Sequence, residues 1–175
     1  MNRSRLESTS TERNHLHEGA RYLLILSCSK RKTSLSGEWP AIQMYDGPIY
    51  RALRKRLNSL DLSLVDICII SAKYGLITAG SMIEHYDCQM TTERAVELRD
   101  VVLSELIKMI QNRSYKEILI NLGSIYRVTI YGIEKYVLGN MQLTFTSGGI
   151  GRKTSQTISW LERVASVGLN SKQIR

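Results

Sequence analysis

Tyr22-Leu23-Leu24-Ile25-Leu26-Ser27-Cys28-Ser29-Lys30-Arg31-Lys32 is the stretch of this 175-residue chain that decides its fold. The first five residues form a continuous apolar run, which is typical of a strand buried on both faces of a parallel sheet. Hydroxyls, a thiol and three cations follow at once. Because ligands bind at the carboxyl ends of the strands in open α/β sheets, this loop predicts a site for a phosphate or another anion.

Three further apolar runs, at Leu64–Ile70, Glu117–Leu122 and Met141–Phe145, alternate with helical patterns. The helices are expected to begin near Pro48, at Thr91 or Thr92, at Ser124, and after Gly151. This alternation predicts a three-layer α/β/α sandwich with a short four-stranded, mainly parallel sheet. The longest connection, Leu76–Met90, is expected to be irregular, and long loops of this kind often carry function.

The length favours one α/β domain, at residues 21–168, with a flexible N-terminal arm at 1–20 and a C-terminal tail at 169–175. The arm is polar and mixed in charge, unlike a signal peptide, and no apolar stretch is long enough to span a membrane. The three cysteines match no zinc-binding spacing. We therefore expect a reduced, cytoplasmic protein with no metal and no organic cofactor.

The formal net charge of +8 favours a polyanionic partner, DNA above all, because cations that neutralise phosphates release bound counterions. A basic surface without a specific partner is the alternative.

A second predicted strand ends in Ser71-Ala72-Lys73-Tyr74-Gly75, which resembles the end of the first. Lys73 is placed to hold a phosphate or to stabilise developing charge, and Tyr74 to clamp a flat ring. Serine and lysine at equivalent places after two strands predict one shared cleft.

Two connections bring carboxylates next to tyrosines. In Tyr45-Asp46-Gly47-Pro48, Asp46 either caps a helix or supplies a catalytic acid, and Tyr45 either stacks on a base or lies in the core. In Glu84-His85-Tyr86-Asp87, Asp87 is a candidate to orient or deprotonate water and His85 to donate a proton. The alternative for this segment is a polar loop whose carboxylate caps the backbone.

The last predicted strand is followed by Ser147-Gly148-Gly149-Ile150-Gly151-Arg152-Lys153. Glycines before a helix allow backbone N–H groups to approach an anion, helped by the helix dipole. The segment is not a Walker A loop, because Arg152 stands where a glycine precedes the lysine. It is not a Rossmann fingerprint either, because Thr154 replaces the third glycine.

Across residues 21–165 the chain resembles a bacterial and phage family that shares five motifs, here at residues 27–32, 45–47, 71–76, 86–87 and 148–151. That family is similar to the uracil-DNA glycosylase-like domain of archaeosine synthase, and more remotely to the bacterial peroxide-stress DNA-binding family. The resemblance implies a uracil-DNA glycosylase-like α/β sandwich that handles nucleobases in nucleic acid. Classical uracil-DNA glycosylases have Gly-Gln-Asp-Pro-Tyr after the first strand and a His-Pro-Ser loop after the last. The different loops of this chain argue against uracil as the base.

These observations lead to the hypothesis of a DNA glycosylase that flips out and hydrolytically excises a modified base. Bulky bases of phage DNA would make it an anti-phage defence enzyme. The alternatives are an enzyme that modifies a nucleotide or a 7-deazaguanine-type base, and a non-catalytic DNA-binding module. The candidate catalytic residues are Asp87, Asp46, Lys73 and His85. The candidate substrate- and DNA-binding residues are Ser27, Cys28, Ser29, Lys30, Lys32, Tyr45, Ser71, Tyr74, Tyr86, Ser147, Gly148, Gly149, Gly151 and Arg152.

Overall fold

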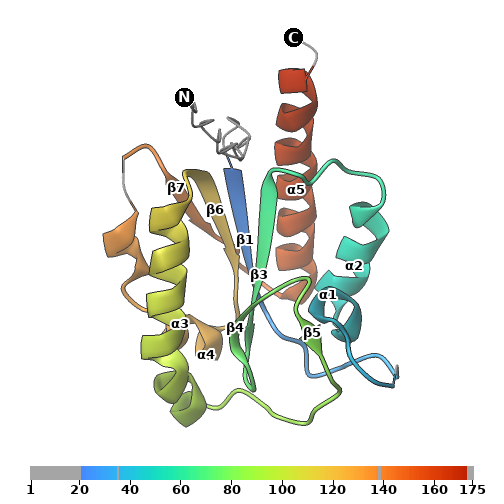
Figure 1. Ribbon diagram of the computed structural model, residues 1–175, viewed down its shortest axis with the longest axis vertical. Helices are drawn as coiled ribbons and strands as arrows, with labels where there is room; N and C mark the ends of the chain where they lie inside the picture. The colour runs from blue at the N-terminus through green and yellow to red at the C-terminus, as the bar shows by residue number, and fades with distance from the viewer. Residues whose placement is uncertain (1–20, 35, 138, 173–175) are drawn as a thin grey trace, which may run out of the picture.

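Strands from both halves of the chain build a single five-stranded sheet in the computed structural model, which describes residues 21–34, 36–137 and 139–172 (Figure 1). The strand order is β4-β3-β1-β6-β7. Four strands are parallel: β1 (Arg21–Ser27), β3 (Val65–Ser71), β6 (Tyr115–Asn121) and β7 (Gln142–Phe145). The predicted α/β class and the mainly parallel sheet are therefore confirmed. The predicted flexible arm at residues 1–20 lies outside the described residues.

The sheet has one more strand than the four predicted. Gly75 has a φ of +72°, a conformation that suits glycine, and it turns the chain sharply after β3. The chain then returns as β4 (Gly75–Thr78), antiparallel to β3. The connection predicted to be irregular also contains β5 (Met82–Ile83), which pairs with β2 (Trp39–Pro40) in a separate two-stranded sheet.

Helices cover both faces of the sheet (Figure 1). On one face lie α2 (Pro48–Leu57) and α5 (Ile150–Lys172), with the short α1 (Ala41–Met44) beside them. On the other lie α3 (Thr92–Asn112), α4 (Ser124–Arg127) and the 3₁₀ turns η1 (Val128–Ile130) and η2 (Ile133–Tyr136). Side chains of β1 alternate between two cores, Leu24 and Leu26 on the α2 side, Leu23 and Ile25 on the α3 side. All four are fully buried, as expected for a central parallel strand.

The helix starts follow local chemistry. Pro48 is the first residue of α2, and the Thr91 hydroxyl caps α3 by accepting the N–H of Arg94 at 3.1 Å. The continuous helix predicted from Ser124 is wrong: α4 ends after one turn, and Gly132 between η1 and η2 has a φ of +92°. Helix α5 begins at Ile150, although it was predicted to begin after Gly151, and it continues to Lys172, although a tail was predicted from residue 169.

The amino ends of the strands are tied together by Asp66 of β3. Its carboxylate accepts hydrogen bonds from Arg21 at 2.9 Å, from Arg113 at 2.6 Å and from the Tyr115 hydroxyl at 2.7 Å. Burial raises the pKa of Asp66, but the hydrogen bonds from Arg21, Tyr115 and Arg113 outweigh it and hold the pKa below its usual value. This cluster lies away from the carboxyl ends, so its role is structural.

Within the described ranges, no helix combines the length and the apolar character needed to cross a membrane. The same residues contain no group of three or more His, Cys, Asp or Glu side chains suited to hold a metal ion.

Candidate functional site

The carboxyl ends of the four parallel strands lie at one edge of the sheet, the lower edge in Figure 1. The chain passes from β1 to β3 on one side and later enters β6 on the other, so the strand order reverses between β1 and β6. Ligands of open α/β sheets bind at such a switch point. Cys28, directly after β1, lies here with its Sγ 3.0 Å from the hydroxyl of Tyr126 in α4. The first predicted loop therefore occupies the position where a ligand is expected.

Tyr86 is the centre of a hydrogen-bonded cluster beside this point. Its hydroxyl lies 2.7 Å from that of Tyr45 and 2.9 Å from the Ser71 Oγ. Ser71 Oγ also accepts the backbone N–H groups of Lys73 at 3.2 Å and Tyr74 at 3.1 Å. Because two acceptor positions of a serine hydroxyl are then occupied, Ser71 donates its own proton to a tyrosine. The cluster joins the predicted motifs at Tyr45, Ser71 and Tyr86, which are far apart in sequence.

Burial separates the roles of the three tyrosines. Tyr45 is fully buried and Tyr86 is nearly so, whereas Tyr74 is 37% exposed. Of the two predicted roles of Tyr45, stacking on a base or packing in the core, its burial agrees with packing in the core. Burial also raises the pKa of Tyr45 to about 12, so its hydroxyl stays protonated at neutral pH. The Tyr74 ring meets the Tyr86 ring edge-on, with 5.3 Å between centroids, and Tyr74 remains partly exposed to solvent.

Two lysines lie against the Tyr86 ring. Lys32 Nζ is 4.0 Å from its centre, and Lys73 Nζ is 5.4 Å from it and 4.9 Å from the centre of Tyr74. Ammonium groups at such distances are attracted by the ring quadrupole. Burial lowers the pKa of Lys32, opposed by the nearby charges of Cys28, Asp87 and Cys88. Asp87 itself is exposed, as is its neighbour His85.

Asp46 is surrounded by cations and does not cap a helix. Its carboxylate pairs with Arg54 at 2.7 Å, Arg31 at 3.3 Å and Arg51 at 3.6 Å. The predicted capping role is wrong, because the N-cap of α2 is Gly47 and no side chain bonds to it. Arg54 also donates to the carbonyl of Tyr45 at 2.6 Å. Asp46 therefore fastens the loop that follows β1 to helix α2.

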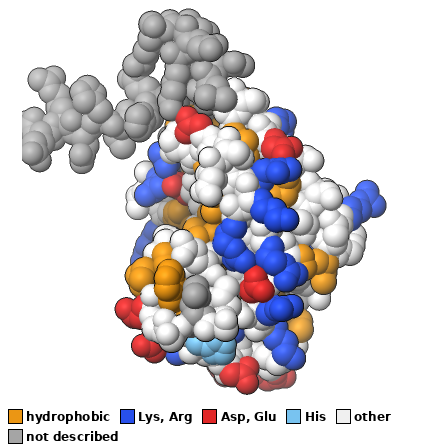
Figure 2. Space-filling model, turned by 90° about the vertical axis from the view of Figure 1, so that its right-hand side faces the viewer, with side chains coloured by type: hydrophobic (Ala, Val, Ile, Leu, Met, Phe, Trp, Pro, Cys, Tyr) orange, Lys and Arg blue, Asp and Glu red, His pale blue; other side chains and the backbone are white. Residues whose placement is uncertain are grey.

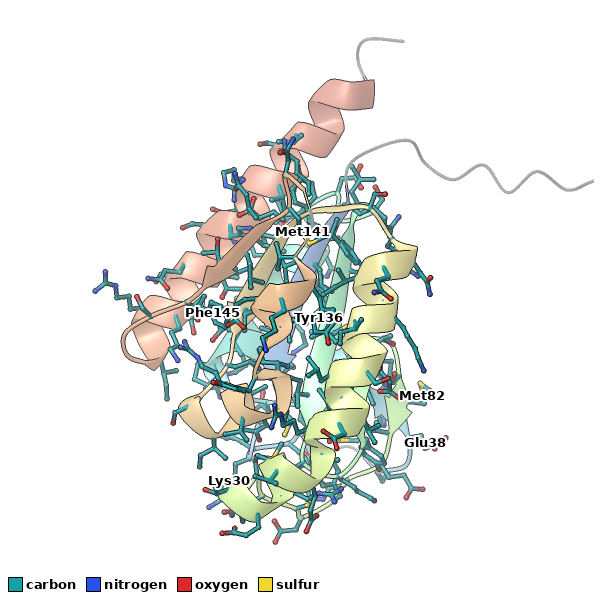
Figure 3. The ribbon with its side chains drawn as sticks, turned by 90° about the vertical axis from the view of Figure 1, so that its left-hand side faces the viewer. Lys30, Glu38, Met82, Tyr136, Met141 and Phe145 are labelled. Atoms are coloured by element: carbon teal, nitrogen blue, oxygen red, sulfur yellow. The ribbon has the colours of Figure 1, made fainter. Side chains whose placement is uncertain are left out.

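Gly47 allows this loop to pack closely. A Cβ at Gly47 would lie 2.8 Å from the Ser29 Oγ, closer than real side chains approach. Lys32 then pairs with Tyr45 in an isolated β-bridge, and the Asp46 N–H donates to the Arg31 carbonyl at 2.8 Å. Lys30 is exposed at the same end of the molecule (Figure 3).

The glycine-rich segment after β7 also lies at the carboxyl edge. The Ser147 N–H donates to the Gln156 side chain at 3.0 Å, and Gly148 has a φ of +88°. Lys153 donates to the carbonyl of Leu122 at 3.0 Å, which fixes the start of α5 to the end of β6. Gly149 lies directly before α5, and Gly151 and Arg152 are in its first turn. β6 lies between β1 and β7, so this segment sits beyond the switch point from the Tyr86 cluster.

Sequence reasoning did not identify three residues that shape the site. Tyr126 contacts Cys28, Arg54 holds Asp46, and Arg94 donates to the carbonyls of Ala72 at 2.9 Å and Lys73 at 3.4 Å. Arg94 follows the α3 cap and precedes Glu97, with which it pairs, so in sequence it looks like a surface residue. The one available signal was the position of Arg51 and Arg54 just after Asp46.

Positive charge extends beyond the edge. Figure 2 shows Lys and Arg side chains gathered in a band on the face that carries α2. Exposed cations of that region are Arg31, Arg51, Lys55 and Arg56. Their partners within the described residues include Asp46 and Glu162, so part of this charge is compensated.

Comparison with known proteins gives a family but no activity. The model of a family of unknown function, DUF6884, matches residues 23–163. The chain belongs to this family. No curated protein matches it. Among solved structures, the crystal structure of AF0587, a protein of unknown function, is similar at 15% identity with a TM-score of 0.49. The match covers 82% of this chain and 45% of AF0587, so the chain spans less than half of that protein.

Proposed function

We propose that this member of the DUF6884 family is a DNA glycosylase that excises a modified base from a flipped-out nucleotide. The observation that carries the proposal is the convergence of Lys32 and Lys73 on Tyr86, next to the exposed Asp87, at the carboxyl edge of the sheet. Together with the exposed Tyr74, this arrangement offers an aromatic ring, two cations and a carboxylate within one small region. The resemblance of the chain's sequence motifs to a family similar to the uracil-DNA glycosylase-like domain of archaeosine synthase supports the same proposal.

In this proposal the flipped base stacks on the exposed side of Tyr74. Cleavage of the N-glycosidic bond leaves negative charge on the departing base. Lys73, against Tyr74, stabilises that charge, and Lys32, whose Nζ lies 4.0 Å from the centre of the Tyr86 ring, assists it. Lys30 and the exposed arginines of α2 contact the flanking phosphates.

The sugar carries positive charge in the transition state, so a carboxylate nearby lowers the barrier. We assign this role, and the orientation of the attacking water, to Asp87, whose carboxylate is exposed. Asp46 is engaged by Arg31, Arg51 and Arg54, so in this proposal it organises the loop instead. His85, also exposed and two residues away, is the candidate proton donor to the base.

The test is the formation of abasic sites. The protein is incubated with plain genomic DNA and with hypermodified phage DNA, and alkali then converts abasic sites into strand breaks. Breaks in phage DNA that disappear in Asp87→Asn but persist in Asp100→Asn support the proposal. Asp100 is the matched control, because it is an exposed carboxylate on α3. Binding of both DNAs without any breaks overturns it.

One observation favours a second candidate. A hydrolytic glycosylase has no evident use for a thiol. Cys28 nevertheless lies at the switch point, and its Sγ is hydrogen-bonded to the Tyr126 hydroxyl. An enzyme that modifies a free nucleotide or a 7-deazaguanine-type base would have such a use. Turnover of a mononucleotide that is lost in Cys28→Ser favours this candidate. Salt-sensitive DNA binding that survives Asp87→Asn, without turnover of any substrate, indicates a DNA-binding module.

A further inference from the structure

A groove runs between β7 and α5, apart from the Tyr86 cluster, and its lining combines apolar side chains with several polar ones. It has a volume of about 610 Å³, and its floor is formed by Glu117 and Leu119 of β6 with Thr144 of β7 and the adjacent Thr146. Its wall is a single stripe of α5, spaced by three or four residues: Arg152, Ser155, Gln156, Ser159, Trp160 and Arg163. Residues with this spacing share one face of a helix. Leu161 and Val164 belong to the apolar face of α5, which packs in the core. The groove residues therefore form a second face of the same helix.

Several polar side chains of the groove have hydrogen-bond donors that can bind a ligand. Gln156 uses its Oε1 to accept the Ser147 N–H at 3.0 Å, so its amide N–H groups remain to donate. The hydroxyls of Thr144, Ser155 and Ser159 add further donors. A ligand rich in acceptor oxygens matches this lining.

The buried carboxylate of Glu117 is neutralised within the groove. It accepts two hydrogen bonds from Arg163 Nη2, at 2.8 and 2.9 Å, and one from Trp160 Nε1 at 2.8 Å. Because these bonds use Nη2 alone, the other guanidinium N–H groups of Arg163 remain available, and its side chain is 55% exposed. Glu117 balances the charge of Arg163, so the lining keeps the one positive charge of Arg152. Among the described residues, Arg152 pairs with no carboxylate.

The groove is continuous with the carboxyl edge of the sheet. Arg152 and Thr146 mark its end beside the Gly148–Arg152 segment. The Phe145 ring (Figure 3) packs on the other face of the sheet, where Arg127 lies 5.1 Å from its centre. From Arg152 to Arg163 the stripe spans about 16 Å at ~1.5 Å per residue. A trough of this length and volume, walled by one helix and one sheet edge, accommodates a short stretch of a single chain.

We propose that this groove binds the phosphodiester backbone of a single nucleic-acid strand next to the flipped nucleotide. The inference rests on the proposed function for the identity of the ligand. Phosphate oxygens accept hydrogen bonds from the hydroxyls and from Gln156. Arg152 neutralises a phosphate at one end of the groove, and the remaining N–H groups of Arg163 donate to another phosphate at the far end.

Binding of a fluorescein-labelled single-stranded oligonucleotide, followed by anisotropy, tests the proposal. Ser155→Glu and Ser159→Glu place a negative charge in the groove, and each is expected to weaken binding about tenfold. Ser104→Glu is the matched control, because Ser104 is an exposed serine on α3, across the sheet. Arg152→Gln is expected to reduce the slope of log K against log salt by ~0.7, the value for one phosphate contact on a single strand. Thermal melting of each variant verifies that it is folded.

Unchanged affinity in both groove variants overturns the proposal, as does equal weakening by Ser104→Glu. Absence of single-strand binding by the parent protein also overturns it. Abasic-site formation is measured on the same samples, which separates this inference from the proposed function. If abasic sites form and the variants bind the oligonucleotide with unchanged affinity, the groove is not a binding site, and the proposed glycosylase activity is supported. Weakened binding in the variants, with no abasic sites formed by the parent protein, supports the groove as a binding site and overturns the proposed glycosylase activity.

Discussion

The ammonium group of Lys32 lies 4.0 Å from the centre of the Tyr86 ring, although the two residues follow different strands and meet only through the fold. The Tyr86 hydroxyl is hydrogen-bonded to the hydroxyls of Tyr45 and Ser71. One tyrosine thus connects the loop after β1 with the end of β3. Its hydroxyl supplies rigidity and its ring holds a cation, and the two contributions can be measured separately.

Replacement of Tyr86 by phenylalanine keeps the ring and removes the hydroxyl. Tyr45 and Ser71 then lose a buried partner, and we expect the free energy of unfolding to fall by about 1–3 kcal/mol. Chemical denaturation measures this change. Tyr131→Phe is the control, because Tyr131 is 72% exposed, and it is expected to change stability by less than about 0.5 kcal/mol. Equal effects of the two substitutions would show that the cluster adds no stability.

Gly47→Ala tests the close packing of the loop after β1. The added Cβ would lie 2.8 Å from the Ser29 Oγ, so the serine or the loop must shift, at a cost of about 1–3 kcal/mol in unfolding free energy. The cost is expected to fall in the double variant with Ser29→Gly, because the clashing side chain is gone. Gly80→Ala serves as control, since nothing lies within 4 Å of its Cβ position. A Gly47 variant as stable as the Gly80 variant contradicts the prediction.

The Asp66 cluster makes the fold sensitive to acid. Since the pKa of Asp66 is lowered in the folded protein, the unfolded chain binds its proton at a higher pH. The stabilisation is therefore complete above the ordinary value of 3.8 and is lost as the pH falls through the lower, folded-state pKa. We expect Asp66→Asn to cost about 1–3 kcal/mol at pH 7, a difference that shrinks as the solution is acidified.

Urea unfolding at a series of pH values measures that difference. Asp100→Asn, an exposed carboxylate of α3, is the matched control. A constant gap between the parent protein and Asp66→Asn at every pH would mean that the carboxylate charge contributes nothing.

The central strands were predictable because continuous apolar runs such as that of β1 have few other uses. Strand β4 was not, because it is only four residues long, lies at a sheet edge, and pairs with β3 only through the turn at Gly75. The carboxyl-edge position of the Ser71–Gly75 and Ser27–Lys32 segments followed from strand polarity alone. The contact of Cys28 with Tyr126 spans 98 positions, so it depends on the order of the crossovers, which no local pattern encodes.

The tyrosines and Asp46 show the same limit at the level of single residues. Tyrosine suits both a buried hydrogen-bonded position and an exposed stacking one, so the sequence left Tyr45 open, and burial decided it. For Asp46 the sequence left a helix cap and a catalytic acid as alternatives, yet Gly47 takes the cap position and Arg31 reaches Asp46 from the preceding loop. Asp46 instead forms ion pairs with Arg31, Arg51 and Arg54, which in the sequence look like solvent-exposed surface residues.

Lys73 provides the sharpest test of the proposed chemistry. It is an exposed residue whose Nζ lies 4.9 Å from the centre of the Tyr74 ring, and its side chain makes no ion pair among the described residues. If Lys73 stabilises the departing base, Lys73→Ala is expected to lower kcat for base release by about 10²-fold, the usual cost of removing one such group. A role in DNA binding alone would raise KM and leave kcat unchanged.

Single-turnover kinetics on hypermodified DNA separate these two outcomes, with Lys108→Ala, an exposed lysine of α3, as the charge-matched control. Lys73→Arg keeps the charge but spreads it over a planar group, so we expect it to restore DNA affinity and only part of the rate. If Lys73→Ala and Lys108→Ala release the base equally fast, Lys73 has no catalytic role. The charge stabilisation must then come from Lys32, which approaches Tyr86 from the loop after β1.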